Sequence, residues 1–580
     1  MTQAIDSLGI ARGAAARQRW REAYDSFSGI DEQELTPADL QSFADSAWLT
    51  GHLDEAIRLR EAAYAGYSSG GEKLKAARLA LILSQDYVSR GLFSIAQGWF
   101  ATGERLLGSE PESGEHAVLA LCRGTAKMFV EGNLPDAIAE FDRAVELGER
   151  HGERDTQLLA LAAKGRALIK SGEIERGFAL LDEASAGAVG GALGTYSTGL
   201  IYCITISSCN DLGDYRRASE WTEAANRWCD QLDVTGFPGA CRVHRAEIMR
   251  LRGELLEAEQ VAVAACEELH DFERFITAAG YNEIGEIRRR LGDFAAAEEA
   301  YRKASELGAD PQPGLSLLRL AEGKRSAAVA GITRTLQETE DALTRIRRLP
   351  AQVEISVAVG DLKTARAAAA ELEQLADAYK IGGRRTPAFD ATIDFARGQI
   401  ALAEGDAKQA ADLFRRSRDG WKQVGAPYET AQARTRLAMS FRRQADEHAA
   451  TAELEAALAS FERLGAKLDE HRVKELLGRE QARRTFMFTD IVDSTRLVAT
   501  LGNEKWRRLL ARHNELLRDR IAEHGGEVVQ QTGDGFFAAF VDAGSAVEAA
   551  IEIQRALDAE IVAPDVRIGA HSGGTFESDG

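Results

Sequence analysis

The sequence contains little proline, few aromatic residues and no long apolar run. Only 10 of its 580 residues are proline and 7% are aromatic, whereas 28% are charged. Scarce proline argues against a disordered tail or a Pro-rich linker as the dominant feature, and abundant alanine with few aromatics favours packed helices over a sandwich of sheets. The chain is too long for one compact core, so we expect several domains or one extended array.

Positive charge is also in deficit. The formal net charge is −20 at pH 7, and binding to nucleic acid requires concentrated lysine and arginine. We therefore expect no nucleic-acid partner. The basic run Arg345, Arg347 and Arg348 is short, and we interpret it as a solvated helix face.

The marks of secretion and of membrane insertion are missing as well. The N-terminus has no charged start followed by an apolar region. The most apolar stretch, residues 192–208, is interrupted by Thr, Tyr and Ser and is short for a bilayer span, so a buried helix is expected. The six cysteines include no C-x-x-C and no histidine at metal spacing, which indicates buried free thiols. We predict a cytoplasmic protein without membrane contact.

What the sequence does contain is a glycine that recurs at a nearly constant interval. The first seven occurrences are separated by 40, 41, 40, 41, 40 and 39 residues, and the spacing then loosens to 31, 37 and 45. A glycine of this kind supplies the positive φ of a tight turn between two antiparallel helices. The ten positions are Gly51, Gly91, Gly132, Gly172, Gly213, Gly253, Gly292, Gly323, Gly360 and Gly405.

Small and aromatic residues follow these glycines at fixed offsets. Ala137, Phe141 and Ala144 lie five, nine and twelve residues after Gly132, on one face of a helix. The same offsets hold Ala297, Tyr301 and Ala304 after Gly292, and Ala410, Phe414 and Ser417 after Gly405. The pattern resembles a tetratricopeptide-like (TPR-like) array with longer helices than usual.

We therefore predict ten or eleven helical hairpins over residues 10–475, stacked into an α-solenoid. The concave face of such a solenoid is typically a protein-binding surface, so a protein partner is expected there. A spacer or dimerisation scaffold without a specific ligand is the alternative.

A β/α pattern replaces the helical period after residue 476. Buried strands are expected at 485–489, 527–531, 536–540 and 566–570, and amphipathic helices at 506–521 and 543–560. The D-G turn at residues 532–535 predicts a hairpin. We thus expect a mainly α protein: a TPR-like α-solenoid at 10–475, a junction at 476–484 and an α/β domain at 485–580.

Two carboxylates stand out in this last segment. Asp490 follows the first expected strand, and Asp534 lies in the hairpin turn. A strand end beside a hairpin tip can bring both to one edge of a sheet, and oxygen ligands there suit Mg²⁺ or Mn²⁺. Aspartate in a turn is more often structural, so spacing alone does not decide between the two interpretations.

The residues of three segments favour a metal-binding role for these aspartates over a structural one. FTDIVDSTRL (488–497), GEVVQQTGDGFFAAF (526–540) and VRIGAHSGG (566–574) together resemble the catalytic domain of class III adenylate/guanylate cyclases, in the family's order. The resemblance covers about 95 residues, roughly the first half of that domain, and implies a ferredoxin-like α/β fold.

The resemblance implies a role for each matching residue. Asp490 and Asp534 would ligate two divalent ions, with the backbone carbonyl of Ile491 as a further ligand. One ion would lower the pKa of the ribose 3′-OH, and the other would neutralise charge as pyrophosphate leaves. The β- and γ-phosphates would be held by backbone amides and hydroxyls of Val492, Asp493, Ser494 and Thr495, with the Asp493 side chain in solvent.

The chain also departs from the family pattern. Gln530 stands where the family often has a purine-contacting lysine, so ATP is the expected substrate and GTP is not excluded. Gly533 is expected to keep a side chain out of the turn that presents Asp534. The family's second purine contact, its Asn and its Arg follow the third segment and are absent from this sequence, which ends at Gly580.

These absences lead to two expectations. A class III site forms between two domains, so the complete form would be a homodimer that converts ATP to cyclic AMP and pyrophosphate under control of the array. Activity of the chain as given is doubtful, since loss of a charge-stabilising group costs on the order of 10²–10³ in rate. A clipped cyclase and a natural degenerate form both stay open, and so does a non-catalytic TPR scaffold with a degenerate half-domain.

An ATP-dependent transcriptional regulator would need a phosphate-binding G-x-x-x-x-G-K-[ST] loop and a helix-turn-helix, and neither is found.

Overall fold

The structure is a computed structural model that describes residues 2–191, 193–231, 238–270, 273–478, 483–560 and 563–574. It divides into two compact units, residues 1–470 and 471–580. Of the expected junction at 476–484, residues 479–482 lie outside the described residues.

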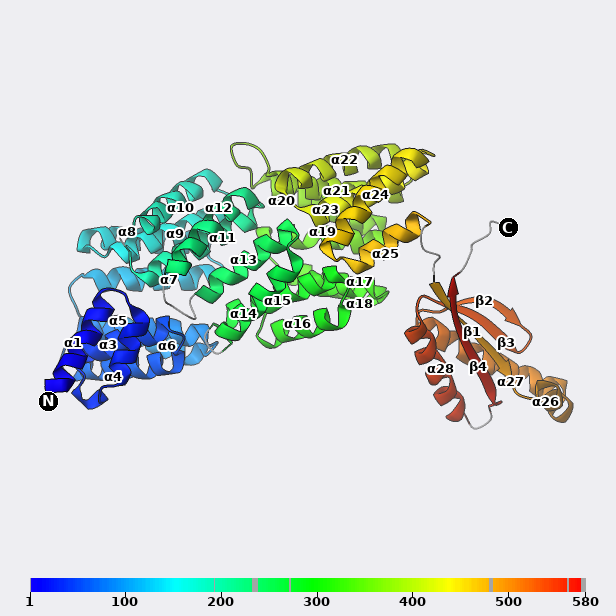
Figure 1. Cartoon of the computed structure of the whole chain (residues 1–580), viewed down its shortest axis with the longest axis horizontal. Helices are drawn as coiled ribbons and strands as arrows, with labels where there is room; N and C mark the ends of the chain where they lie inside the picture. Colours follow the sequence, from blue (N-terminus) through cyan, green and yellow to red (C-terminus); the bar gives the residue numbers. More distant parts are fainter. Residues whose placement is uncertain are drawn as a thin grey trace. The chain divides into compact units, whose positions relative to one another are not determined.

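The first unit consists of helices arranged as consecutive antiparallel hairpins (Figure 1). A single turn of 3₁₀-helix, Glu32–Glu34, lies between the first two hairpins. The helices are α1 (Thr2–Ala16), α2 (Trp20–Ser28), α3 (Pro37–Leu49), α4 (Leu53–Ser69), α5 (Lys73–Ser89), α6 (Phe93–Leu107), α7 (Gly114–Phe129), α8 (Leu134–His151), α9 (Arg154–Lys170), α10 (Ile174–Val189), α11 (Thr195–Asp211), α12 (Tyr215–Gln231), α13 (Pro238–Arg252), α14 (Leu255–Leu269), α15 (Arg274–Leu291), α16 (Phe294–Glu306), α17 (Gly314–Ala321), α18 (Arg325–Glu338), α19 (Ala342–Ala358), α20 (Leu362–Asp377), α21 (Pro387–Ala403), α22 (Ala407–Val424), α23 (Pro427–Arg443), α24 (Glu447–Leu464) and α25 (Lys467–Leu476).

Every repeated glycine lies in the turn inside a hairpin, as predicted. All ten have positive φ, between 65° and 91°. Two further hairpins make the same turn without glycine, because Gln18 (φ 57°) joins α1 to α2 and Ala445 (φ 60°) joins α23 to α24. The helices α3–α24 thus form eleven hairpins in the described residues, and α1 with α2 forms another. The sequence did not predict these two turns, because the prediction located each turn by its recurring glycine.

The predicted small-aromatic-small face is buried. Ala137, Phe141 and Ala144 are each 0% exposed. The ring of Phe141 lies against Gly124 of the preceding helix, where an added Cβ would come within 2.5 Å of the ring. The hairpin therefore closes through a glycine on one helix and an aromatic ring on the other. Gly285 with Tyr301 and Gly398 with Phe414 repeat this contact.

The array winds so that helices far apart in sequence touch. The Tyr379 hydroxyl donates to the Lys170 carbonyl at 3.0 Å, and the Thr386 hydroxyl donates to the Leu212 carbonyl at 3.0 Å. An ion pair of 2.7 Å joins Lys170 to Asp341. One apolar cluster accordingly runs from α7 to α21. The array folds back on itself instead of remaining an open chain of hairpins.

The interpretation of the basic run as a solvated face is wrong for Arg345 and Arg348, whereas the side chain of Arg347 is 55% exposed. Arg345 pairs with Glu371 at 2.6 Å, Arg347 with Asp211 at 2.9 Å and Arg348 with Asp310 at 3.1 Å. The Arg348 side chain is only 13% exposed. The partners come from elsewhere in the array, so no local pattern could reveal them.

Two expectations about sequence chemistry hold in the structure. All six cysteines are free, and four of them are buried. The apolar stretch predicted as a buried helix is α11 from Thr195 onward, whereas Ala192 lies outside the described residues. No helix in the described part of the chain has the length and apolar character needed to cross a membrane.

The second unit is a four-stranded antiparallel sheet with its helices on one face (Figure 1). The strand order is β2-β3-β1-β4, as in the expected ferredoxin-like fold. Its elements are β1 (Arg483–Ile491), α26 (Ser494–Leu501), α27 (Asn503–Glu523), β2 (Glu527–Thr532), β3 (Gly535–Phe540), α28 (Ala543–Asp558) and β4 (Val566–Gly574). Alongside the predicted helix at 506–521 there is a separate shorter one, α26, divided from it at Gly502 (φ 74°).

The two faces of this sheet differ. On β1, alternate residues such as Met487 (0% exposed) and Ile491 (2%) pack against α27 and α28. The residues between them point to the other face, where Phe488 is 51% exposed. The ring of Phe537 stacks on Phe486 and Phe488 with centroid distances of 5.3 and 4.8 Å. An aromatic patch therefore remains uncovered in this unit.

Candidate active site

The strand register brings the two aspartates to one end of the sheet. Asp490 is the penultimate residue of β1, and Asp534 lies in the turn between β2 and β3. Thr489 of β1 pairs with Phe536 of β3, so the antiparallel register continues with Asp490 opposite Gly535. The Thr489 hydroxyl accepts a hydrogen bond from the Phe536 N–H at 3.0 Å, which holds these two strand ends together.

The turn that presents Asp534 depends on the backbone of Gly533. Gly533 has φ 63°, in the left-handed region. An added Cβ would meet nothing within 4 Å, so space is not the constraint that the sequence suggested. The backbone conformation is the constraint, because residues with a Cβ rarely adopt this φ.

One carboxylate oxygen at this end of the sheet lacks a partner. Asp534 Oδ2 is buried and accepts no hydrogen bond within the described residues. A buried carboxylate oxygen is costly unless a cation or a donor approaches it. Asp490, in contrast, is exposed on the open face of the sheet. A buried, unpaired oxygen and an exposed carboxylate at the same end of a sheet fit a divalent ion, which prefers hard oxygen ligands.

A buried histidine lies behind the turn. His513 of α27 is 2% exposed, and burial lowers its pKa, whereas the adjacent Asp534 opposes that shift. His513 lies within the amphipathic helix that the sequence predicts at 506–521. The helical period predicts that His513 is buried, but it does not show that the turn with Asp534 lies against this side chain.

The expected phosphate-binding segment is only partly free to bind an anion. The Val492 N–H already donates to the Asp565 carbonyl at 2.8 Å, so this amide is not available. Asp493 adopts φ 52° and precedes the first turn of α26, which begins with Ser494 and Thr495. The first amides of a helix have no carbonyl partner within it and attract anions.

The remaining site residues also alternate between the helix-covered face and the open face of the sheet. Ile491 turns its side chain into the core, so only its main chain can reach the edge. Gln530 is exposed and pairs with Phe537, on the same open face as Asp490. Arg567 of β4 pairs with Asp490 in the register and is exposed. The sequence did not single out Arg567, because the order of the strands is needed to place it there.

Two family models match this chain, one in the C-terminal unit and one in the helical unit. Residues 479–577 match the family model described as "Adenylate and Guanylate cyclase catalytic domain". Residues 278–310, which span most of α15 and all of α16, match the family model described as "Tetratricopeptide repeat". Residues 479–577 are therefore similar to a cyclase catalytic domain, and residues 278–310 to a tetratricopeptide repeat.

Whole-chain comparisons are less specific. No curated protein matches the chain. Among solved structures, a chain in "Crystal structure of APC/C hetero-tetramer Cut9-Hcn1" is similar, with 13% identity and a TM-score of 0.34, over 80% of this chain and 95% of that one.

Proposed function

We propose that the C-terminal unit provides the metal-binding and phosphate-binding part of a class III nucleotide cyclase site, which converts ATP to cyclic AMP and pyrophosphate. The observation that carries the proposal is the position of Asp490 and of the unpartnered oxygen of Asp534 at the same end of the sheet. The match of residues 479–577 to the cyclase family supports it.

Each residue would have a defined task. Asp490 and Asp534, with the Ile491 carbonyl, would hold two Mg²⁺ or Mn²⁺ ions. Bound there, the ions would supply acidity to the ribose 3′-OH and charge neutralisation to the triphosphate. The first turn of α26, including Ser494 and Thr495, would bind phosphate oxygens, while Gln530 would contact the purine edge. A glutamine amide both donates and accepts, so GTP stays a second possible substrate.

The open face of the sheet supports a two-domain site. The stacked rings of Phe486, Phe488 and Phe537 form an aromatic patch on the face that carries Asp490, with Phe488 exposed and the other two half-buried. Exposed apolar patches of this kind mark interaction surfaces. We infer that a second cyclase domain covers this face, which makes the protein a homodimer.

The helical array would be the regulatory part. We infer that it binds a protein partner, as TPR-type repeats form extended concave surfaces. The free cysteines are compatible with a reducing cytoplasmic location.

Binding of Mn²⁺ to the intact chain tests the metal site directly. Titration calorimetry is expected to detect Mn²⁺ binding to the wild type that is lost in Asp490→Asn and in Asp534→Asn. Asp493→Asn is the matched control, because asparagine tolerates the left-handed conformation and the neighbouring amides are kept. Mn²⁺ binding that survives both substitutions would contradict the proposal and favour a non-catalytic scaffold.

Nucleotide turnover is the second measurement. Protein mixed with a separate class III domain that provides its own Asn and Arg is incubated with Mn²⁺ and ATP or GTP, and the cyclic product is quantified. Product formation that Asp490→Asn abolishes is expected.

A further inference from the structure

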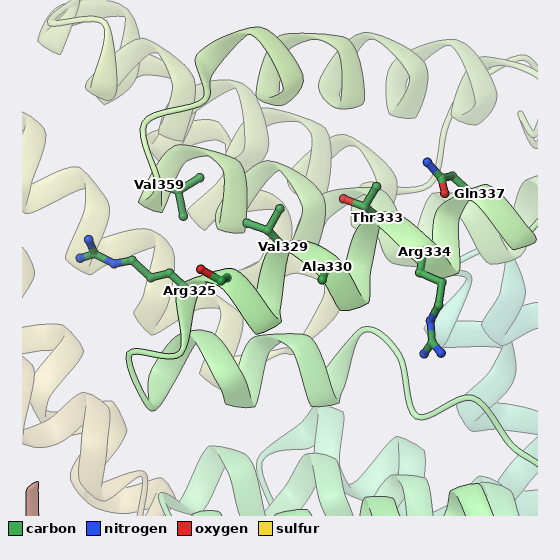
Figure 2. A pocket seen from close by; sticks show the side chains of 8 residues that line it. Arg325, Val329, Ala330, Thr333, Arg334, Gln337 and Val359 are labelled. Atoms are coloured by element: carbon green, nitrogen blue, oxygen red, sulfur yellow. The ribbon is translucent and has the colours of Figure 1, made fainter. Parts of the chain in front are cut away.

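Among the described residues of the helical unit, two hollows differ in kind. The hollow in Figure 2 follows one side of α18, with Val359 added from the end of α19. Its side chains, among them Arg325, Arg334 and Gln337, are exposed. The other hollow, here called the central cavity, has a volume of about 510 Å³ and lies among helices of distant hairpins.

The central cavity exists because the array folds back on itself. Its walls come from α11, α13 and α15 on one side of the sequence and from α19, α21 and α23 on the other. Direct contact between α13 and α23 and the Arg347–Asp211 ion pair close it. Its volume is within the range of about 300–1,000 Å³ that small-molecule sites occupy.

Buried hydrogen-bond acceptors without partners line this cavity. In the described residues, Asn210 Oδ1, Asn282 Oδ1 and Glu429 Oε2 are inaccessible and accept no hydrogen bond. Arg290 Nε and Nη1 on the same wall also lack a hydrogen-bond acceptor, but Nη1 lies 2.9 Å from Glu429 Oε1 in an ion pair. The Asn210 amide has a fixed orientation, because its nitrogen donates to Glu247 Oε2 at 3.0 Å. Its oxygen therefore points away from Glu247 and accepts no hydrogen bond in the described residues. Buried acceptors of this kind cost free energy until a donor reaches them.

Carboxylates outnumber guanidinium groups on the walls. Six acidic side chains and four arginines line the cavity, an excess of two carboxylates. Three of the acids pair with lining arginines: Glu283 with Arg250, Glu429 with Arg290 and Asp211 with Arg347.

The three lining acids that do not pair with a lining arginine differ in their contacts. Glu286 pairs with Arg289 behind the wall at 2.9 Å, and Glu247 binds Asn210. Glu354 lines the cavity without an ion-pair partner among the residues that the structure describes. Excess negative charge and unpaired acceptors disfavour an anionic ligand such as a nucleotide or phosphate.

We propose that the central cavity binds a small organic cation whose amino groups donate hydrogen bonds, that is, a protonated aliphatic amine. Glu354 supplies the charge, and the Asn210 and Asn282 oxygens accept the N–H groups. Trp421 and Phe395 line the same walls, and aromatic rings attract cations. This site is independent of the proposed cyclase chemistry.

Calorimetry on the full chain tests the ligand class with three kinds of probe. Putrescine and agmatine represent amines, sorbitol and glucose represent neutral molecules rich in hydroxyl groups, and inorganic phosphate represents anions. One amine molecule is expected to bind per chain, and the other probes are not. Absence of amine binding, or binding of sorbitol or glucose instead, would overturn the proposal.

Substitutions separate the cavity from the acidic surface of the protein, which could also attract amines. Glu354→Gln keeps the size of the side chain and is expected to weaken amine binding by about tenfold or more. Glu140→Gln of α8 is the matched control, since Glu140 is also half-buried and does not line the cavity. Asn282→Leu provides a second variant if the first is unstable. Equal affinity in wild type and both cavity variants would assign the binding to the surface and refute the site.

Discussion

At the scale of single residues, the Arg12–Asp39 pair shows how a helix start is stabilised. Asp39 completes a capping box with Thr36 at the start of α3. Both of its oxygens accept hydrogen bonds from the Arg12 guanidinium, at 2.6 and 2.7 Å. The Arg12 hydrogen bonds lower the pKa of Asp39 from 3.8 to about 2. The folded state therefore binds this proton less readily than the unfolded state does.

This shift predicts a pH-dependent stability. A carboxyl group with a depressed pKa stabilises the fold above its unfolded value, and the contribution is lost as pH falls from 3.8 towards about 2. Asp39→Asn is expected to lower the free energy of unfolding at pH 7 by about 1 kcal/mol, since exposure of Arg12 weakens the pair. Urea unfolding of both proteins should show that their difference shrinks below pH 3.8. A difference that stays constant with pH would contradict the assignment.

At the residue scale, the sequence predicted that Asp490 lies at a strand end and Asp534 in a turn, and the structure has both there. Asp490 and Asp534 were found because strand ends and D-G turns have local signals. His513 and the occupied Val492 amide were not, because both depend on a neighbour that is distant in sequence. The role of each aspartate stays a prediction until metal binding is measured.

At the scale of helices, a glycine of one helix packs against an aromatic ring of the next in three of the hairpins. Tyr301 is 1% exposed, and its hydroxyl donates to Glu286 at 2.8 Å, so the ring is held on both sides. A Cβ on Gly285 would lie 2.4 Å from the ring edge.

Gly285→Ala is therefore expected to destabilise the helical unit by about 1–3 kcal/mol through overpacking. Gly98→Ala in α6 is the matched control, because nothing lies within 4 Å of the added Cβ. Alanine there is expected to stabilise the helix by up to about 1 kcal/mol. Chemical denaturation measures both. Similar effects of the two substitutions would show that helix propensity, not the ring contact, sets the result.

At the scale of the whole molecule, the aromatic patch of the sheet predicts self-association. Phe488→Asp places a charge on the exposed ring of the patch and is expected to convert a dimer into a monomer. Val547→Asp on α28 is the control, because Val547 is 50% exposed, close to the 51% of Phe488, but lies on a helix. Light scattering after size-exclusion chromatography measures the mass. A wild-type monomer, or a monomer produced by both substitutions, would refute the dimer.

The sequence by itself determined the hairpins and the sheet. A glycine period, the buried offsets after it and alternating strands are local patterns, and each sets the conformation of its own segment. Only the tertiary structure decided that the array closes on itself and encloses a cavity, that the run at Arg345–Arg348 is ion-paired, and that Asp534 keeps an unpaired oxygen. These features depend on small rotations summed over many hairpins and on pairs distant in sequence. No local pattern encodes such sums.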